Sequence, residues 1–206
     1  EVAVARDIVL AKMTGARLHV AHVSTRGSLE LIRRAKDEGV AVTCETCPHY
    51  FTLTDDDVRS YDTNLRVNPP LRGSDDVAAI KEALSDGTID AIASDHAPHS
   101  LEEKQVEFDE APPGMIGLET LLPLTLTHLV EPGTITLDRA VELMSTDPAS
   151  ILGLPHGSIA AGEPADVTVF DPDWGWEIAE DWFASRSSNS PFVGRRVKGR
   201  VILTVS

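Results

Sequence analysis

The chain has 206 residues, of which 42% are hydrophobic, and a formal net charge of -15 at pH 7. This length and composition allow a sizeable core in one domain, or in one domain and part of another. The acidic balance argues against a nucleic-acid partner, which requires clustered Lys and Arg. No apolar run approaches the roughly 18–20 residues that span a bilayer, so we expect a soluble protein without a membrane partner.

The first residues fall directly into a helical pattern. Residues 2–14 place Val2, Ala5, Val9 and Met13 on one face of a helix, and a glycine follows. The start has no initiator methionine and no signal-peptide layout. We take it to indicate a fragment of a longer protein.

Helices and strands alternate over the first 150 residues. The predicted strands are residues 18–23, 40–47 and 89–94, and the predicted helices are residues 2–14, 27–38, 74–86, 117–130 and 136–146. Ser74 and Thr136 are candidate N-caps, and Leu29, Ile32 and Ala35 are expected to face inward. This alternation implies parallel strands with right-handed crossovers. Because three such strands cannot close a sheet, half of an α/β barrel fits better than a complete domain.

The pattern changes after residue 152. Glycines and a proline punctuate short strand-like runs at residues 165–170 and 196–205, without helical periodicity. We expect a small β appendage, which divides the chain into a barrel portion (residues 1–152) and a β portion (residues 153–206).

A cluster of polar side chains ends the apolar run at residues 89–99. Asp95 is suited to bind a metal or to act as a base, and His96 and His99 to ligate, donate hydrogen bonds or shuttle protons. In barrel enzymes such side chains gather at the C-terminal ends of the strands. The alternative is a polar strand end whose groups bond to nearby backbone, and this segment alone does not decide between the two.

Two further histidines close strands of the same predicted sheet. His22 ends its strand where Asp95 ends its own, and His49 follows the strand between them. Nitrogen and oxygen ligands of this kind suit zinc, which lowers the pKa of a bound water to about 7. A single strand histidine is more often structural, so ligation by His22 depends on the pairing with Asp95. His49 is either a ligand or a hydrogen-bond donor beside one.

Two loops add candidate ligand contacts. Pro69 restricts the backbone of Asn68, whose amide could meet a donor and an acceptor of a ligand. The alternative for Asn68 is a cap on local backbone. Pro113 precedes Gly114, a residue type that lets backbone approach a ligand closely.

The two cysteines, Cys44 and Cys47, form a C-x-x-C pair on a predicted strand rather than at a helix start. Side chains three apart on a strand point to opposite faces, and no second Cys/His pair has a matching spacing. We expect two unpaired reduced thiols, which weakly favours a cytoplasmic protein.

Together these residues resemble class I dihydroorotases of the amidohydrolase superfamily, nearly from end to end. The motifs that carry the resemblance are Ala21-His22-Val23-Ser24-Thr25, Glu45-Thr46-Cys47-Pro48-His49, Asn68-Pro69-Pro70-Leu71-Arg72, Asp95-His96-Ala97-Pro98-His99, Gly117-Leu118-Glu119-Thr120 and Ser188-Asn189-Ser190-Pro191-Phe192. Allantoinases and dihydropyrimidinases share the frame but usually differ at the Asn-Pro-Pro-Leu-Arg and Asp-His-Ala-Pro-His motifs.

The resemblance implies a (β/α)8 TIM barrel with one or two zinc ions and a β-sandwich built from both chain termini. It implies that His22, on the sixth strand, ligates the second zinc ion. Asp95, on the eighth strand, would contact the first zinc ion and act as general base and acid. Asn68, His99 and the backbone of Pro113 and Gly114 match positions that hold the small-molecule substrate. His49 and His96 lie in the motifs but are not family zinc ligands, and they remain candidates for supporting contacts.

The family's first-strand His-x-His, the Arg that follows it, the bridging carboxylate and the fifth-strand His would lie before Glu1. The chain therefore carries about half of the site, and its first partner would be the N-terminal half of the same enzyme. The implied activity is reversible hydrolysis of dihydroorotate to N-carbamoyl-aspartate in pyrimidine synthesis. Alternatives are an allantoinase or hydantoinase type of cyclic amidohydrolase, and a non-catalytic homologue that binds aspartate carbamoyltransferase. A homodimer also stays open.

Overall fold

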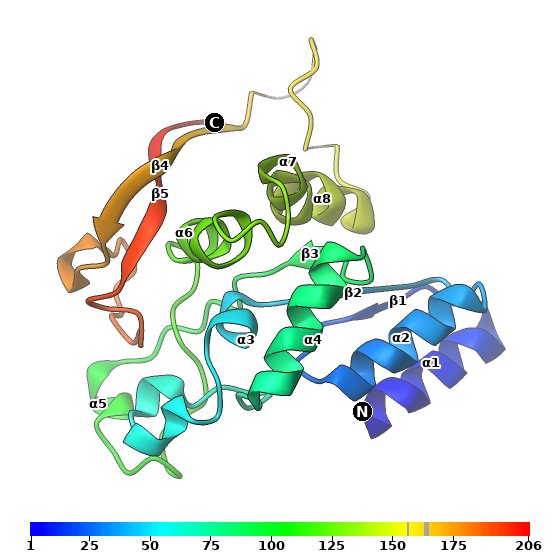
Figure 1. The fold of residues 1–206 in the computed structure, drawn as a ribbon, viewed down its shortest axis with the longest axis horizontal. Coiled ribbons are helices and arrows are strands. Elements are labelled where there is room, and N and C mark those ends of the chain that lie inside the picture. Colours follow the sequence, from blue (N-terminus) through cyan, green and yellow to red (C-terminus); the bar gives the residue numbers. More distant parts are fainter. Residues whose placement is uncertain (156, 163–164) are drawn as a thin grey trace.

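The protein forms a parallel sheet covered by helices, followed by an antiparallel pair of strands (Figure 1). The computed structural model describes residues 1–155, 157–162 and 165–206. The strands are β1 (Leu18–Val20), β2 (Val42–Thr46), β3 (Ala91–Ile92), β4 (Val167–Glu177) and β5 (Arg196–Val205). The α-helices are α1 (Val2–Thr14), α2 (Arg26–Asp37), α3 (Pro48–Thr52), α4 (Ser74–Ser85), α5 (Leu101–Lys104), α6 (Leu121–Thr125), α7 (Leu137–Val141) and α8 (Asp147–Leu152). The shorter 3-10 and π segments are η1 (Asp57–Ser60), η2 (Thr63–Leu65), η3 (Leu126–Val130), η4 (Glu142–Thr146) and η5 (Glu180–Trp182).

The three N-terminal strands lie in the order β1-β2-β3, and both pairs are parallel. This confirms the predicted parallel sheet with helical crossovers. Each strand is shorter than predicted: β2 and β3 begin later than predicted, and all three strands end earlier. His22 and Asp95 have φ values of 54° and 47°, so neither belongs to its strand.

Helices α1, α2 and α4 lie on one side of the sheet, and α2 packs against both α1 and α4 (Figure 1). Leu29, Ile32 and Ala35 of α2 are buried, as predicted. They join the core with Val42 and Cys44 of β2. Because side chains alternate along a strand, Thr43, which lies between these two residues, points to the other face of the sheet.

The face of α1 that carries Val2, Val9 and Met13 is not its buried face. Val2, Val9 and Met13 are 86%, 54% and 78% exposed, whereas Ala11 is buried and Val4 and Ile8 pack against the core. The helix carries apolar residues on nearly every face, so its hydrophobic pattern does not single out one side. The helix itself is confirmed, and Gly15 ends it in the left-handed conformation.

The other helix boundaries follow local capping chemistry. Thr136 caps α7 by accepting a hydrogen bond from the Arg139 N–H, as predicted. Gly73, not Ser74, is the N-cap of α4. The helix predicted over residues 117–130 starts at Leu121 and ends in the π segment η3, and the helix predicted over residues 136–146 continues through η4 and α8.

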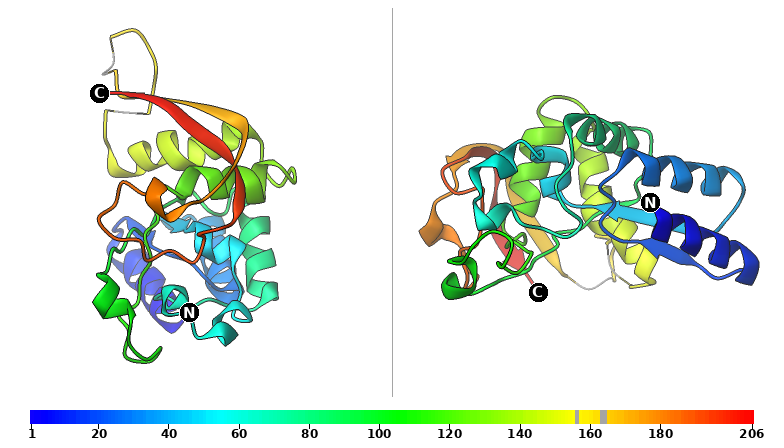
Figure 2. Two further views of the ribbon diagram at one scale, coloured as in Figure 1. Left: turned by 90° about the vertical axis from the view of Figure 1, so that its left-hand side faces the viewer. Right: turned by 90° about the horizontal axis from the view of Figure 1, so that it is seen from below.

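The C-terminal strands β4 and β5 form one antiparallel pair that packs against α6 and η3 (Figure 2). The Lys198 N–H donates to Thr127 Oγ1, and Trp176 Nε1 donates to the Gly199 carbonyl. The strand predicted at residues 165–170 begins at Val167 and continues to Glu177. Over the described residues, no helix has both the length and the apolar character needed to cross a bilayer.

Candidate metal centre and substrate loops

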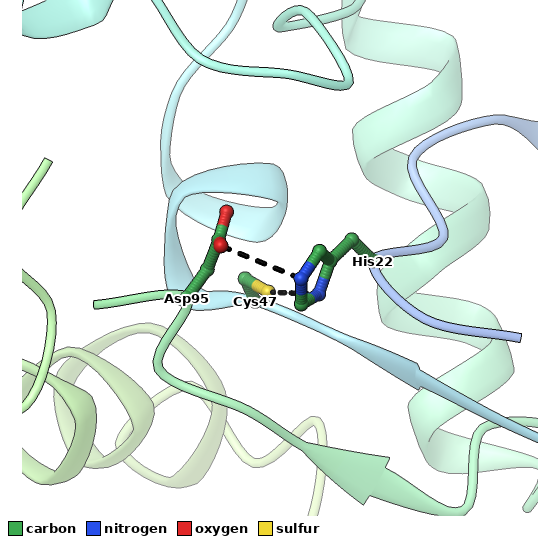
Figure 3. A group of neighbouring side chains, drawn as sticks. All are labelled: His22, Cys47 and Asp95. Carbon is green, nitrogen blue, oxygen red and sulfur yellow. Dashed lines mark hydrogen bonds and ion pairs between the residues drawn. The ribbon is translucent and has the colours of Figure 1, made fainter. Parts of the chain in front are cut away.

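His22, Cys47 and Asp95 meet just beyond the C-terminal ends of β1, β2 and β3 (Figure 3). His22 Nε2 lies 3.4 Å from Asp95 Oδ1, and His22 Nδ1 lies 3.4 Å from Cys47 Sγ. The carboxyl ends of parallel strands share one edge of the sheet, which is why residues far apart in the sequence converge here. Two residues predicted as metal ligands, His22 and Asp95, therefore face each other.

The backbone at both predicted ligands is unusual. His22 and Asp95 are two of the three non-glycine residues with positive φ among the described residues. This conformation is sparsely populated for residues with a side chain, and it persists where the surrounding structure holds it in place. At both positions it turns the chain at the strand end and brings the imidazole and the carboxylate together.

Glu45 of β2 contacts two histidines of the neighbouring strand segment. Its Oε1 lies 3.1 Å from His22 Nδ1 and its Oε2 lies 3.3 Å from His19 Nε2. His19 Nδ1 lies 2.8 Å from Thr43 Oγ1. Glu45 and Thr43 share the face of β2 opposite to the buried Cys44, so these contacts form a polar line along that face.

The charged groups along this face of β2 shift one another's pKa values. The hydrogen bond to Glu45 raises the pKa of His22, while partial burial opposes the shift and Asp95 adds to it. Burial raises the pKa of Glu45, but the hydrogen bonds from His22 and His19 outweigh it and leave that pKa lowered. Glu45 is therefore a carboxylate that accepts hydrogen bonds at neutral pH.

His49 lies beneath the same edge of the sheet. Its side chain is 2% exposed and its Nε2 has no hydrogen-bond partner, although Asp95 Oδ2 is 3.7 Å away. Burial, with a smaller contribution from the charge of His22, lowers the pKa of His49 to about 3. His49 is thus a neutral imidazole whose buried polar atom is directed at the Asp95 carboxylate.

The donor set at this edge suits a zinc-type metal ion. The 3.4 Å between His22 Nε2 and Asp95 Oδ1 is close to the roughly 3.3 Å expected between two ligands that bind one tetrahedral ion at about 2.0–2.1 Å. His22 Nε2 and Asp95 are therefore well placed to share one ion, whereas the resemblance implies that they contact two different ions. Cys47 Sγ lies beside the other ring nitrogen, and burial raises the pKa of its thiol well above the usual value. Both cysteines are free and buried, which confirms the predicted unpaired thiols.

The predicted substrate-binding residues lie on loops that pack together. His99 Nε2 donates to the Pro113 carbonyl at 3.2 Å, and the Gly114 N–H donates to the Arg66 carbonyl at 2.8 Å. The second contact joins the loop of Gly114 to the loop that carries Asn68. Asn68 is exposed and, among the described residues, makes no side-chain hydrogen bond, so the alternative of a local backbone cap is not observed.

Gly114 shows why a glycine is required in this loop. Its φ is 143°, and a Cβ at this position would lie 2.6 Å from the Ala97 Cβ and 3.0 Å from His99 Nε2. The backbone of Gly114 thus passes directly against the segment that carries His99. A side chain here would displace that segment.

Two buried polar residues, neither assigned a role from the sequence, hold these loops. Lys104 is 5% exposed, and its Nζ donates to the Pro112 and Gly114 carbonyls at 3.0 Å each. Asn189 donates from Nδ2 to the Ala97 and Gly114 carbonyls, and its Oδ1 accepts from the His99 N–H. The burial of Lys104 lowers its pKa. Nothing in the sequence around Lys104 indicated this role, whereas Asn189 belongs to the motif Ser188-Asn189-Ser190-Pro191-Phe192.

His96 supports the fold rather than the candidate metal-binding edge. This edge is the group of residues His22, Cys47 and Asp95, together with Glu45 beside them. Its Nδ1 accepts hydrogen bonds from the backbone N–H groups of Gly117 and Leu118. A Cβ at Gly117 would collide with the Ser94 carbonyl, so this loop crosses tightly over the strand end that leads to Asp95. Tyr50 has a similar role, because its hydroxyl donates to the Pro69 carbonyl at 2.7 Å and fixes the loop of Asn68.

A cavity of about 590 Å³ opens beside the loops. His99, Lys104 and Asn189 contribute to its lining, whereas His22 and Asp95 do not. The cavity therefore belongs to the loop region and not to the metal-binding edge.

Several known proteins are similar to this chain in sequence, and several solved structures are similar to it in fold. The chain is 57% identical over 205 residues to the dihydroorotase of Geobacter metallireducens and 56% identical to that of Pelobacter propionicus. Each match covers 100% of this chain and 48% of the relative, so the chain spans about half the length of these proteins.

Solved structures give a matching fold. An L-hydantoinase (dihydropyrimidinase) from Arthrobacter aurescens superposes with a TM-score of 0.93 at 36% identity, covering 98% of this chain and 46% of that protein. A dihydropyrimidinase from Brevibacillus agri gives a TM-score of 0.93 at 30% identity, covering 99% of this chain and 46% of that protein. The model of the amidohydrolase family matches residues 1–206. The chain belongs to the amidohydrolase family.

Proposed function

We propose that this chain is part of a zinc-dependent dihydroorotase, which interconverts dihydroorotate and N-carbamoyl-L-aspartate by hydrolysis of a cyclic amide. The observation that carries the proposal is the pairing of His22 with Asp95 beyond the ends of β1 and β3, 3.4 Å apart. Relatives that are 52–57% identical over essentially the whole chain are named dihydroorotase, which supports this substrate.

The parallel sheet and its helices would form the C-terminal half of a (β/α)8 barrel. In this proposal residues 1–152 belong to the barrel, and residues 153–206 supply strands of a β-sandwich. The exposed apolar side chains of α1 fit such a half, because Val2, Val9 and Met13 would then face the rest of the barrel. The N-terminal half would also supply the remaining metal ligands, since a catalytic zinc site needs about three protein ligands.

His22 and Asp95 would hold one or two zinc ions together with that half. Zinc supplies a polarised ring carbonyl and a water of lowered pKa. Asp95 accepts the proton of the attacking water and passes it to the ring nitrogen as the C–N bond breaks. The neutral His49, with its Nε2 3.7 Å from Asp95 Oδ2, keeps a polar group beside this carboxylate without adding a charge.

The loop residues would hold the substrate rather than the metal. His99 and Asn68 are polar side chains on loops beyond the strand ends, and the Pro113–Gly114 backbone is fixed between Lys104 and Asn189. A rigid loop of this kind orients a small polar ring with little loss of entropy on binding.

One alternative is a hydantoinase or allantoinase type of activity. Solved structures with a matching fold include hydantoinases and dihydropyrimidinases, but their identities of 26–36% are lower than those of the dihydroorotases at 52–57%. A second alternative is a non-catalytic homologue that stabilises aspartate carbamoyltransferase. The two buried free thiols fit a reducing, cytoplasmic setting in each case.

The test is an assay of the full-length protein with zinc on three rings: dihydroorotate, hydantoin and allantoin. We expect turnover of dihydroorotate to exceed that of the other two by orders of magnitude. Preferred turnover of another ring would replace dihydroorotate as substrate. A metal-free protein that hydrolyses none of them but binds aspartate carbamoyltransferase would support the non-catalytic homologue.

A further inference from the structure

Glu45 is a half-buried carboxylate that the proposed reaction does not use. It is 19% exposed and lies on the strand between those that lead to His22 and Asp95. Its two oxygens contact different histidines, His22 through Oε1 and His19 through Oε2. A charge held in this position needs an explanation, because burying a carboxylate costs free energy unless its hydrogen bonds are satisfied.

The contacts of His19 anchor Glu45 from behind. The Thr43 hydroxyl lies 2.8 Å from His19 Nδ1, and His19 Nε2 lies 3.3 Å from Glu45 Oε2. When the hydroxyl donates to Nδ1, the proton of His19 sits on Nε2 and points at Glu45. The Glu45 side chain is therefore held in one orientation, with its second oxygen directed at His22.

The contact with Glu45 likewise determines which ring nitrogen of His22 carries the proton. Glu45 Oε1 accepts a hydrogen bond, so the proton of the neutral His22 ring lies on Nδ1. The lone pair is then left on Nε2, which faces Asp95 Oδ1 at 3.4 Å. Two acceptors face each other across this gap, an arrangement that a cation between them would satisfy.

We propose that Glu45 is a positioning residue that fixes the ring orientation and the proton position of His22, so that Nε2 is free to bind the metal ion. This inference rests on the proposed function. A carboxylate that binds the outer nitrogen of a ligating histidine usually contributes 10- to 100-fold to metal affinity. Cys47 Sγ also lies near His22 Nδ1, but at 3.4 Å it is farther away and is a weaker acceptor than the carboxylate.

The decisive variant is Glu45→Gln in the full-length protein. Glutamine keeps the shape of the side chain, but its amide can donate to His22 Nδ1 and so favour the tautomer with the proton on Nε2. We expect the zinc dissociation constant, measured by competition with a chelator, to rise about 10- to 100-fold. The ¹⁵N chemical shifts of the His22 ring in the metal-free protein should show the proton moving from Nδ1 to Nε2.

Asp90→Asn is the matched control. Asp90 is also a half-buried carboxylate, 24% exposed, but it pairs with Lys36 at 2.7 Å and does not contact His22. It should change stability without changing zinc affinity or the His22 tautomer. Cys47→Ala should also leave the tautomer unchanged, because Glu45 Oε1 is the nearer and stronger acceptor at His22 Nδ1.

The outcomes distinguish a failure of the role of Glu45 from a failure of the proposed function. Unchanged zinc affinity and an unchanged His22 tautomer in Glu45→Gln would overturn the role of Glu45 while leaving a zinc-binding, active wild type intact. A shift of the tautomer in Cys47→Ala, and not in Glu45→Gln, would assign the role to the thiol instead. A wild type that binds no zinc and hydrolyses no dihydroorotate would overturn the proposed function itself.

Discussion

The proposed metal-binding edge and the proposed substrate loops are held together in different ways. At the edge, side chains contact side chains: His22 contacts Glu45 and Asp95, and each residue bears or shares a charge. In the loops, buried Lys104 and Asn189 hold backbone carbonyls in place. The chemistry at the edge therefore depends on particular functional groups, whereas the loops depend on shape. Substitutions at the edge should change the reaction with little effect on folding, and substitutions that support the loops should change binding and stability.

The largest expected effect is at the edge. Asp95→Asn in the full-length protein should lower kcat by at least about 10²–10⁴, because it removes the proposed proton carrier and one metal ligand. The melting temperature should stay close to that of the wild type, since asparagine keeps the size of the side chain and Asp95 is only partly buried, at 24% exposed. Steady-state kinetics and calorimetry check both parts, and a variant that retains more than about a tenth of wild-type activity would assign the proton transfer to another group.

A smaller effect is expected from the groups proposed to hold the substrate. Asn68→Ala and His99→Ala should each raise KM and lower kcat/KM by about 10- to 100-fold, as expected for the loss of a hydrogen bond to a charged substrate. Zinc content, measured on the same preparations, should not change. Loss of the metal from either variant would show that the separation between edge and loops is wrong, and His99 would be reassigned first.

The loop supports should act mainly on stability. Lys104→Met keeps the length of the side chain but leaves the Pro112 carbonyl without its donor and the Gly114 carbonyl with Asn189 alone, which should cost about 1–3 kcal/mol of unfolding free energy. Activity at saturating substrate should fall by less. Lys81→Met, at a half-buried lysine of α4 outside these loops, is the control for denaturant unfolding. Equal losses in the two variants would remove the special role of Lys104.

The smallest effect is a pH dependence of the metal-free protein. Because the hydrogen bond to Glu45 raises the pKa of His22 above its usual value near 6.5, the protonated ring stabilises the folded state. This contribution is fully present below the unfolded pKa and is lost as the pH rises through the folded pKa. Stability of the metal-free protein should therefore decline above about pH 6.5, and His22→Gln should remove this decline. Identical pH profiles for the two proteins would contradict the shift.

Sequence patterns predicted the framework well because alternating helices and strands carry strong periodic signals. The parallel direction of β1, β2 and β3, the buried face of α2 and the presence of β4 and β5 all follow from such patterns. The sequence did not indicate which face of α1 is buried, because its apolar residues surround the helix. The end of β1 was placed too late, since the change to positive φ at His22 leaves no periodic signal.

The site was predictable where a motif carried it, and less so where contacts are made across the fold. His22 and Asp95 were candidates from their positions at strand ends, but the link through Glu45 depends on which side chains face each other across β1 and β2. Lys104 belongs to a polar segment that gives no hint of burial, and it becomes buried only when residues 112–114 fold over it. Such contacts follow from tertiary packing, which a single sequence does not display.

The most direct measurement is the position of zinc in crystals of the full-length protein, located by anomalous scattering at the zinc absorption edge. We predict a zinc ion bound by His22 Nε2 and an Asp95 oxygen, with Glu45 still hydrogen-bonded to His22 Nδ1. A zinc ion in the active protein that touches neither His22 nor Asp95 would contradict this prediction.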